Sequence, residues 1–244
     1  MEKSAPLRVN NICKSFDAKE VLKSLSFSLE EGEIFGLIGL NGIGKTTLIK
    51  IILDLLTPDS GEASLFGQPS SNVASRRNLS YLPEKFQPSR YLKGHEYLAL
   101  SLSFFGKTYD PLQAQREAEA IDLDPTALDQ LVGAYSKGMG QKLGLLGAIM
   151  VETPLLILDE PMSGLDPKAR ILLKERMKNL QKAGRTIFFS SHILTDIDEI
   201  CSRIGVLHNG ELLYIGTPDE FKKSRHREAL EPAFLDAITT QDAA

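Results

Sequence analysis

The sequence contains only two cysteines and has no apolar run long enough to cross a bilayer. Cys13 and Cys201 are too few for a disulfide framework, and their spacing fits no metal site, so we expect reduced core cysteines. A membrane-spanning helix needs about 20 apolar residues, whereas the longest apolar segments here are LGLLGAIMV and LLIL. A role at a membrane would therefore require a second chain that spans it.

The chain also lacks an excess of positive charge and an apolar N-terminal segment. Its net charge is −4 and its pI is about 5.7, which gives no electrostatic basis for a nucleic-acid partner. The first ten residues, MEKSAPLRVN, contain no apolar stretch of the kind that forms a secretory signal. A length of 244 residues with 42% apolar residues fits one globular domain, with room for an inserted lobe.

Apolar periodicity divides the chain into strand-rich and helix-rich parts. In the first third, alternating or continuous apolar runs predict strands at 7–16, 21–29, 33–38, 62–66 and 79–82, with a helix at 46–56. A helical period then predicts helices at 93–106, 111–121 and 142–151. After Pro154, strands and helices alternate, which indicates parallel strands joined by helical crossovers. An Asn-Gly turn predicts a hairpin at 206–216, before a capped helix start at TPDEF.

These patterns predict an α/β fold with a mixed sheet core, an antiparallel β part and an inserted helical lobe. We expect a single domain over residues 1–244. Within it, the predicted parts are a core at about 1–87 and 151–216, a helical lobe at about 88–150 and a short helical tail at 217–244.

Residues 39–47, GLNGIGKTT, match the phosphate-loop pattern G-x-x-x-x-G-K-[ST]. A buried strand precedes the pattern and a helix follows it, which disfavours an unliganded glycine turn. The glycines let backbone N–H groups turn toward phosphate oxygens, and the N-terminus of the helix favours the same anion. Lys45 is then placed to reach the β- and γ-phosphates, and the Thr46 hydroxyl to ligate Mg²⁺.

Two further motifs follow buried strands and therefore emerge at the same edge of the sheet. LLILDEP ends its strand with Asp159, a candidate Mg²⁺ ligand, and Glu160, a candidate base for the attacking water. SSH places His192 at the same edge, where it would contact the γ-phosphate. Acidic residues at strand ends are often only solvated, and a lone histidine usually has a structural role. Here both motifs are expected at the sheet edge that carries the phosphate loop, which favours a functional site. Three histidines lack such a context and are read as surface or structural residues: His95, His208 and His226.

Taken in order, these motifs resemble the ATP-binding subunit of an ABC transporter over about residues 7–236. Phe16 in KSF matches the aromatic that stacks on adenine, GLNGIGKTT matches Walker A and LLILDE matches Walker B. SGLD matches the D-loop, His192 the switch histidine, and YSKGMGQK aligns with LSGGQ. YSKGM, YLPE and LEPAFLDAI resemble one branch more closely, the ATPases of bacterial exporters for polysaccharides, drugs and similar cargo.

The resemblance implies ATP and Mg²⁺ as ligands and assigns residues to each. Glu160 would be the base and His192 the γ-phosphate sensor, with Lys45 on the phosphates. Mg²⁺ would be held by Thr46, Glu84 and Asp159. The implied nucleotide contacts are Phe16, Gly39, Leu40, Asn41, Gly42, Ile43, Gly44, Lys45, Thr46, Thr47, Ser136, Lys137, Gly138, Met139 and Asp166.

Several residues depart from the family pattern. Leu40 and Ile43 replace smaller residues or proline in Walker A, where backbone donors matter more than side chains. Glu84 stands where most of the family has glutamine; it keeps an oxygen ligand but adds a negative charge near the phosphates. Lys137 replaces the first glycine of LSGGQ, and Met139 replaces its glutamine. Whether the Lys137 charge contacts nucleotide or solvent stays open.

The resemblance also implies partners. Two such subunits pair head to tail, so each ATP lies between the phosphate loop of one and the LSGGQ-like stretch of the other. The second subunit is this chain or a paralogue, and the pair works with a membrane-spanning permease at the cytoplasmic face of the inner or plasma membrane. The alternative is a soluble ABC-type ATPase not coupled to transport. Such proteins usually carry two cassettes, a coiled-coil insertion, zinc cysteines or a basic linker, none of which occurs in this sequence.

Aromatic residues of the lobe have two interpretations. They either form the core of the lobe or, together with residues 84–89, line a docking groove for a short helix of the membrane partner. These residues are Tyr91, Tyr97, Phe104, Phe105 and Tyr109. The sequence does not name the cargo, whereas the resemblance to the exporter branch implies export as the direction of transport.

Overall fold

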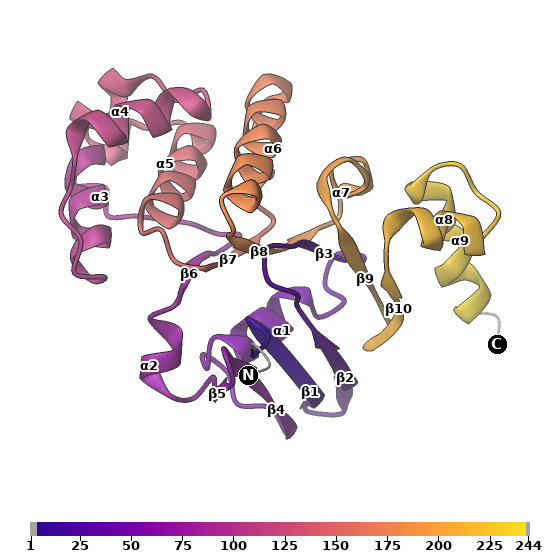
Figure 1. Ribbon diagram of the computed structural model, residues 1–244. Coiled ribbons are helices and arrows are strands. Elements are labelled where there is room, and N and C mark those ends of the chain that lie inside the picture. Colours follow the sequence, from indigo (N-terminus) through magenta and orange to yellow (C-terminus); the bar gives the residue numbers. More distant parts are fainter. Residues whose placement is uncertain (1–3, 243–244) are drawn as a thin grey trace.

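Two β-sheets form the frame of the structure, a computed structural model that describes residues 4–242 (Figure 1). The larger sheet contains β3 (Ile34–Ile38), β6 (Leu79–Leu82), β7 (Leu155–Asp159), β8 (Thr186–Ser191), β9 (Arg203–His208) and β10 (Glu211–Gly216). Its order is β10–β9–β3–β8–β7–β6, parallel except for the β9–β10 hairpin. The smaller, antiparallel sheet contains β1 (Leu7–Phe16), β2 (Lys19–Ser28), β4 (Ser60–Leu65) and β5 (Gln68–Pro69).

Helices cover both faces of the larger sheet (Figure 1). One face is covered by α1 (Lys45–Ile52), which lies between the two sheets. The other face carries α3 (Gly94–Ser103), α4 (Pro111–Ala120), α5 (Lys137–Met150), α6 (Pro167–Lys182) and α7 (Leu194–Ile200). The remaining helical segments are α2 (Val73–Arg76), η1 (Pro125–Asp129), η2 (Val132–Ala134), α8 (Pro218–Ser224) and α9 (Leu230–Asp242). None of the helices within residues 4–242 has the length and apolarity needed to cross a bilayer.

Alternation along the central strands assigns each side chain to one of two cores. In β7, Leu156 and Leu158 join the core under α3–α7, whereas Leu155 and Ile157 join the core around α1. All five residues of β7 are buried, because helices or a second sheet cover both faces. Because side chains alternate along a strand, Asp159 lies on the same face of β7 as Leu155 and Ile157, which is the face toward α1. The orientation of the site therefore follows from strand parity.

The predicted fold class is confirmed, and most elements lie where periodicity placed them. One helix differs: α5 begins at Lys137 rather than at residue 142, because the Ser136 side chain accepts a hydrogen bond from the Met139 N–H and caps it. Gly138 and Gly140 therefore lie inside a helix despite their low helix propensity. Cys13 and Cys201 form no disulfide; both are partly buried rather than fully in the core, and Cys201 packs against the core under α3–α7. The division into core, lobe and tail stays a prediction, and its residues 1–3 and 243–244 lie outside the described part.

Three phenylalanine rings join the two sheets, and their loss should be costly. Phe27 of β2 stacks on Phe35 and Phe188 of the larger sheet at centroid distances of 5.4 and 6.1 Å. Phe188→Ala should lower the free energy of unfolding by about 3–5 kcal/mol, because it leaves a cavity between the sheets. Urea denaturation measures this loss. Leu55→Ala, at a side chain that is 67% exposed, is the control and should stay within about 0.5 kcal/mol; a comparably small change for Phe188→Ala would contradict the assignment.

Candidate functional site

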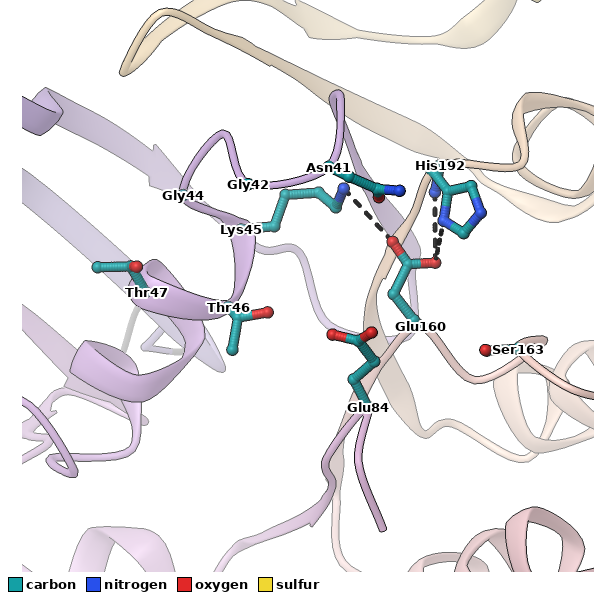
Figure 2. A pocket seen from close by; sticks show the side chains of 10 residues that line it. All are labelled: Asn41, Gly42, Gly44, Lys45, Thr46, Thr47, Glu84, Glu160, Ser163 and His192. Atoms are coloured by element: carbon teal, nitrogen blue, oxygen red, sulfur yellow. Dashed lines mark hydrogen bonds and ion pairs between the residues drawn. The ribbon is translucent and has the colours of Figure 1, made fainter. Parts of the chain in front are cut away.

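Residues of the phosphate loop, Glu84, Glu160 and His192 meet in a cavity of about 350 Å³ at the carboxyl edge of the larger sheet (Figure 2). It lies at the carboxyl ends of β3, β7 and β8, where ligands bind in parallel sheets. The cavity is lined by Asn41, Gly42, Gly44, Lys45, Thr46, Thr47, Glu84, Glu160, Ser163 and His192. Four segments that are distant in sequence therefore contribute to one surface.

The loop between β3 and α1 has the backbone that only glycine adopts without strain. Gly42 and Gly44 have φ values of 75° and 119°. A Cβ at Gly44 would lie 2.9 Å from Leu22 Cδ2 on β2, so this glycine is also required by the close packing of the loop. The loop is thus held in one shape, with its backbone open to the cavity, as phosphate binding requires.

Lys45, the first residue of α1, is only 6% exposed, yet its ammonium group is fully partnered. Its Nζ donates to the Gly39 carbonyl at 2.7 Å and to the Leu40 carbonyl at 3.3 Å. It also lies 3.3 Å from Glu160 Oε1 (Figure 2). The cation therefore stands between the phosphate loop and the second acid of β7, as its predicted role requires.

Asp159 is completely buried and is held by two hydroxyl groups. Because it faces α1, its Oδ2 accepts a hydrogen bond from Thr46 Oγ1 at 2.8 Å. Its Oδ1 accepts one from Ser190 Oγ at 2.5 Å, since Asp159 and Ser190 are paired in register on neighbouring strands. The Ser190 hydroxyl also accepts from the Glu160 N–H at 3.0 Å. Ser190 thus positions both acids.

The charge on Asp159 is destabilised by its surroundings. Burial raises the pKa of its carboxyl above the usual range, the hydrogen bonds from Ser190 and Thr46 oppose this rise, and the nearby Glu84 and Glu160 charges add to it. A cation between Thr46, Asp159 and Glu84 would relieve this cost, and oxygen donors are what Mg²⁺ prefers.

A metal held by the protein alone is not indicated. Within residues 4–242 there is no cluster of three or more His, Cys, Asp or Glu arranged to hold a metal ion. The donors present therefore fit a Mg²⁺ ion that takes its remaining ligands from phosphates and water.

Glu160 has the most constrained geometry in the site. Its φ of 51° lies in the left-handed region, which costs a non-glycine residue about 1 kcal/mol or more. Oε2 lies 2.8 Å from His192 Nδ1, a hydrogen bond when that nitrogen carries the proton. Oε1 is buried and accepts no hydrogen bond from any residue that the structure describes. Glu160 thus has one oxygen oriented by His192 and a second, Oε1, whose one described polar partner is the Lys45 cation at 3.3 Å.

The LSGGQ-like residues lie outside this cavity. Ser136 and Lys137 line a neighbouring groove of about 800 Å³, which shares Glu84 and Ser163 with the cavity. The Lys137 stem lies over Gly164, where a Cβ would come within 3.2 Å of Lys137 Cε. In one chain the phosphate loop and the LSGGQ-like stretch thus face different hollows.

Other predicted contacts are spread over the surface and the core. Phe16 and Leu40 are each 46% exposed, at the end of β1 and in the phosphate loop. Ile43 and Met139 pack their side chains against the two hydrophobic cores, so only their backbones are free for a ligand. Asp166 caps α6 by accepting a hydrogen bond from the Ala169 N–H at 2.9 Å.

Sequence reasoning missed two polar residues that fix the site. Ser190 was detectable as a polar residue inside the buried strand TIFFSS. Gln141 is 6% exposed and donates to the Pro161 carbonyl at 3.2 Å, which ties the start of α5 to the segment after Glu160. Nothing in its helical sequence context signals this contact.

Asp159→Asn should stabilise the nucleotide-free protein. Folding raises the pKa of Asp159, so the protonated carboxyl favours the folded state. This contribution to the free energy of unfolding is complete below the ordinary pKa of aspartate and is lost as the pH rises through the pKa of the folded protein. Asparagine removes that loss, so Tm near pH 7 should rise in calorimetry without Mg²⁺ or nucleotide.

The matched control is Asp124→Asn. Hydrogen bonds from Thr126 lower the pKa of Asp124, so its ionised form favours the folded state and the substitution should lower Tm. A lower Tm for Asp159→Asn near pH 7 would show that the hydroxyl hydrogen bonds outweigh the charge.

Comparison with known proteins agrees with this geometry. The family model described as ABC transporter matches residues 22–163, more than half of the chain. An uncharacterized ABC transporter ATP-binding protein of Nostoc sp. is 41% identical over 209 residues. That alignment covers 84% of this chain and 62% of the relative, so this chain spans less than two thirds of that protein.

Two further matches cover more of their proteins. The Nod factor export ATP-binding protein I of Burkholderia orbicola is 36% identical over 88% of this chain and 71% of its own length. A solved structure, described as the ATP-binding subunit of an ABC transporter, superposes with a TM-score of 0.85 at 32% identity and covers 95% of this chain and 98% of that one. The chain therefore belongs to the ABC transporter family, as one of its ATP-binding proteins.

Proposed function

We propose that this chain hydrolyses ATP to power transport, with export as its direction, through a separate membrane-spanning permease. The observation that carries the proposal is the convergence of Lys45, Thr46, Glu160 and His192 on one cavity, with the buried Asp159 bonded to Thr46. The name of the Burkholderia relative refers to Nod factor export, which supports the outward direction. The alternative remains a soluble ABC-type ATPase not coupled to transport.

The residues divide the chemistry among them. Glu160 accepts the proton as water attacks the γ-phosphorus and the bond to the ADP oxygen breaks. His192 holds one oxygen of Glu160 and senses the γ-phosphate from the same edge. Lys45 and the N–H groups of the phosphate loop stabilise the phosphate charge. Thr46, Glu84 and Asp159 would hold Mg²⁺, which neutralises charge on the phosphates when bound.

A second subunit, either this chain or a paralogue, completes the site. Ser136, Lys137 and Gly138 begin α5 in a separate groove, so their N–H groups are available to an ATP held by another chain. Phe16, half exposed at the end of β1, would stack on adenine. Asp166 lies beside the same surface and would link the two subunits. ATP bound between them closes the pair, and loss of the γ-phosphate reopens it.

Glu160→Gln tests the catalytic assignment. The amide keeps the shape of the side chain but cannot accept the proton, so ATP turnover should fall by at least about 100-fold. ATP binding should persist, and the closed dimer should accumulate in size-exclusion chromatography with Mg²⁺ and ATP. Glu152→Gln is the matched control, because Glu152 pairs with Lys107 at 2.7 Å in the lobe. Wild-type turnover in the Glu160 variant would refute its role.

The aromatic residues of the lobe divide into two groups. Tyr97 and Tyr109 pack against the lobe core, as the core interpretation predicts. That interpretation is wrong for Tyr91 and Phe104, which are 90% and 79% exposed, because they project from the turn before α3 and from its end. Phe105, 37% exposed, joins Phe104 and α2 around a hollow of about 570 Å³, lined by Val73, Arg76, Arg77, Phe104, Phe105 and Gly106.

This hollow, here called the α2–α3 hollow, is the permease-docking site that we propose. It differs from the predicted groove, because residues 84–89 and Tyr91 line the separate groove of about 800 Å³ with Ser136 and Lys137. Exposed Phe104 and Val73 would bury their apolar surface against a short amphipathic helix, while Arg77 favours acidic residues on that helix; Arg76 is already paired with Asp54 at 2.8 Å. The chain would thereby sit at the cytoplasmic face of the membrane without spanning it.

Phe104→Asp tests the docking site. A carboxylate there should abolish co-purification with a co-expressed six-span protein from a neighbouring gene, because its burial against a helix is unfavourable. ATP turnover of the isolated chain should not change, since Phe104 lies outside the catalytic cavity. Leu55→Asp, at an exposed leucine that does not line the hollow, is the control and should keep the partner. Retention of the partner by the Phe104 variant would place docking elsewhere.

A further inference from the structure

The ion pair of Lys14 and Asp59 lies beside Phe16, the residue whose ring is proposed to stack on adenine. We propose that Lys14 and Asp59 are positioning residues that hold the Phe16 ring and the end of β1 in place for the base. The inference rests on the proposed ATP-binding function and adds two residues that no motif of the sequence singled out.

The end of β1 needs support because it projects beyond one of its neighbours. Where β1 pairs with β4, Leu7 lies opposite Leu65 and Cys13 lies opposite Ser60, the first residue of β4. Residues 14–16 of β1 therefore extend past β4. On the other side, the pairing with β2 is irregular between Lys14 and Ser15. The segment that carries Phe16 therefore has an incomplete strand ladder.

Asp59 completes this ladder with its backbone and its side chain. Its N–H donates to the Cys13 carbonyl at 2.9 Å. Its Oδ2 accepts from the Ser15 N–H at 2.6 Å, and its Oδ1 accepts from Lys14 Nζ at 2.7 Å. The Lys14 hydrogen bond, and then that of Ser15, lowers the pKa of Asp59 and keeps it ionised. One carboxylate thus holds the two residues that precede Phe16.

Lys14 carries this constraint to the ring. Residues 14 and 16 lie on the same face of the strand, and Lys14 Nζ lies 5.5 Å from the centroid of the Phe16 ring. The Lys14 side chain is 15% exposed, whereas Phe16 is 46% exposed. The cation covers one side of the ring and limits its rotation, so the opposite side is presented to a stacking base.

The same segments connect the ring to the phosphate loop. Asp59 lies in the turn between α1 and β4, and α1 begins with Lys45 of the phosphate loop. On the other side, Leu22 and Val21 of β2 pack on Gly44, and β2 pairs Lys19 with Phe16. The base and phosphate ends of the site are therefore held at a fixed spacing.

Lys14→Met removes the ammonium group and keeps an apolar stem. Calorimetric titration should show about 5- to 10-fold weaker ATP binding, while the affinity for inorganic tripolyphosphate, which has no base, stays within about twofold. Asp59→Asn should act in the same way. KM for ATP should rise, with turnover at saturating ATP unchanged. Lys107→Met, which breaks the 2.7 Å Lys107–Glu152 pair in the lobe, is the matched control and should leave both affinities unchanged.

Phe16→Ala separates positioning from general stability. If Lys14 acts through the ring, Lys14→Met should weaken ATP binding by less than about twofold further in the Phe16→Ala background. Unchanged ATP affinity in Lys14→Met, or equal loss of ATP and tripolyphosphate, would overturn the inference. A wild-type chain that binds neither ATP nor tripolyphosphate would contradict the proposed function itself.

Discussion

The burial of one carboxylate, Asp159, is the constraint on which the rest of the site depends. A charge at zero exposure is tolerated only because Thr46 and Ser190 donate to both of its oxygens. Those donors lie on α1 and β8, so the phosphate-loop helix and two strands must meet in one register. The sheet, covered on both faces, provides that register, and strand parity turns Asp159 toward α1. The site is thus built around an acid that destabilises the folded chain.

Much of this arrangement was predictable from the sequence, for identifiable physical reasons. Strands β3, β7 and β8 are short apolar runs that end in motifs, and parallel pairing brings such ends together. Apolar periodicity could not show that α5 begins at Lys137, because glycines disfavour helix and the Ser136 cap overrides them; only the family resemblance placed Ser136 and Gly138 at the start of this helix. Nor could it separate Tyr97, which is packed, from Phe104, which is exposed, since both belong to one helical period.

The contacts of Lys14, Gln141 and Ser190 illustrate the same limit. Each is an ordinary polar residue whose importance comes from a partner far away in sequence: Asp59, Pro161 and Asp159. A sequence motif identifies residues that face a ligand, because those residues must lie at fixed spacings along the chain. Residues that act through a neighbour depend on register between elements, which no local pattern contains.

The Gln141–Pro161 hydrogen bond joins two functions that the sequence presents as separate. Pro161 follows the proposed base, and Gln141 lies in the first turns of the helix that would face the partner's nucleotide. In the dimer that we propose, a displacement of Glu160 would therefore also move the start of α5 and the residues that face the partner's nucleotide. The two sites would then respond to a substitution as a pair rather than one at a time.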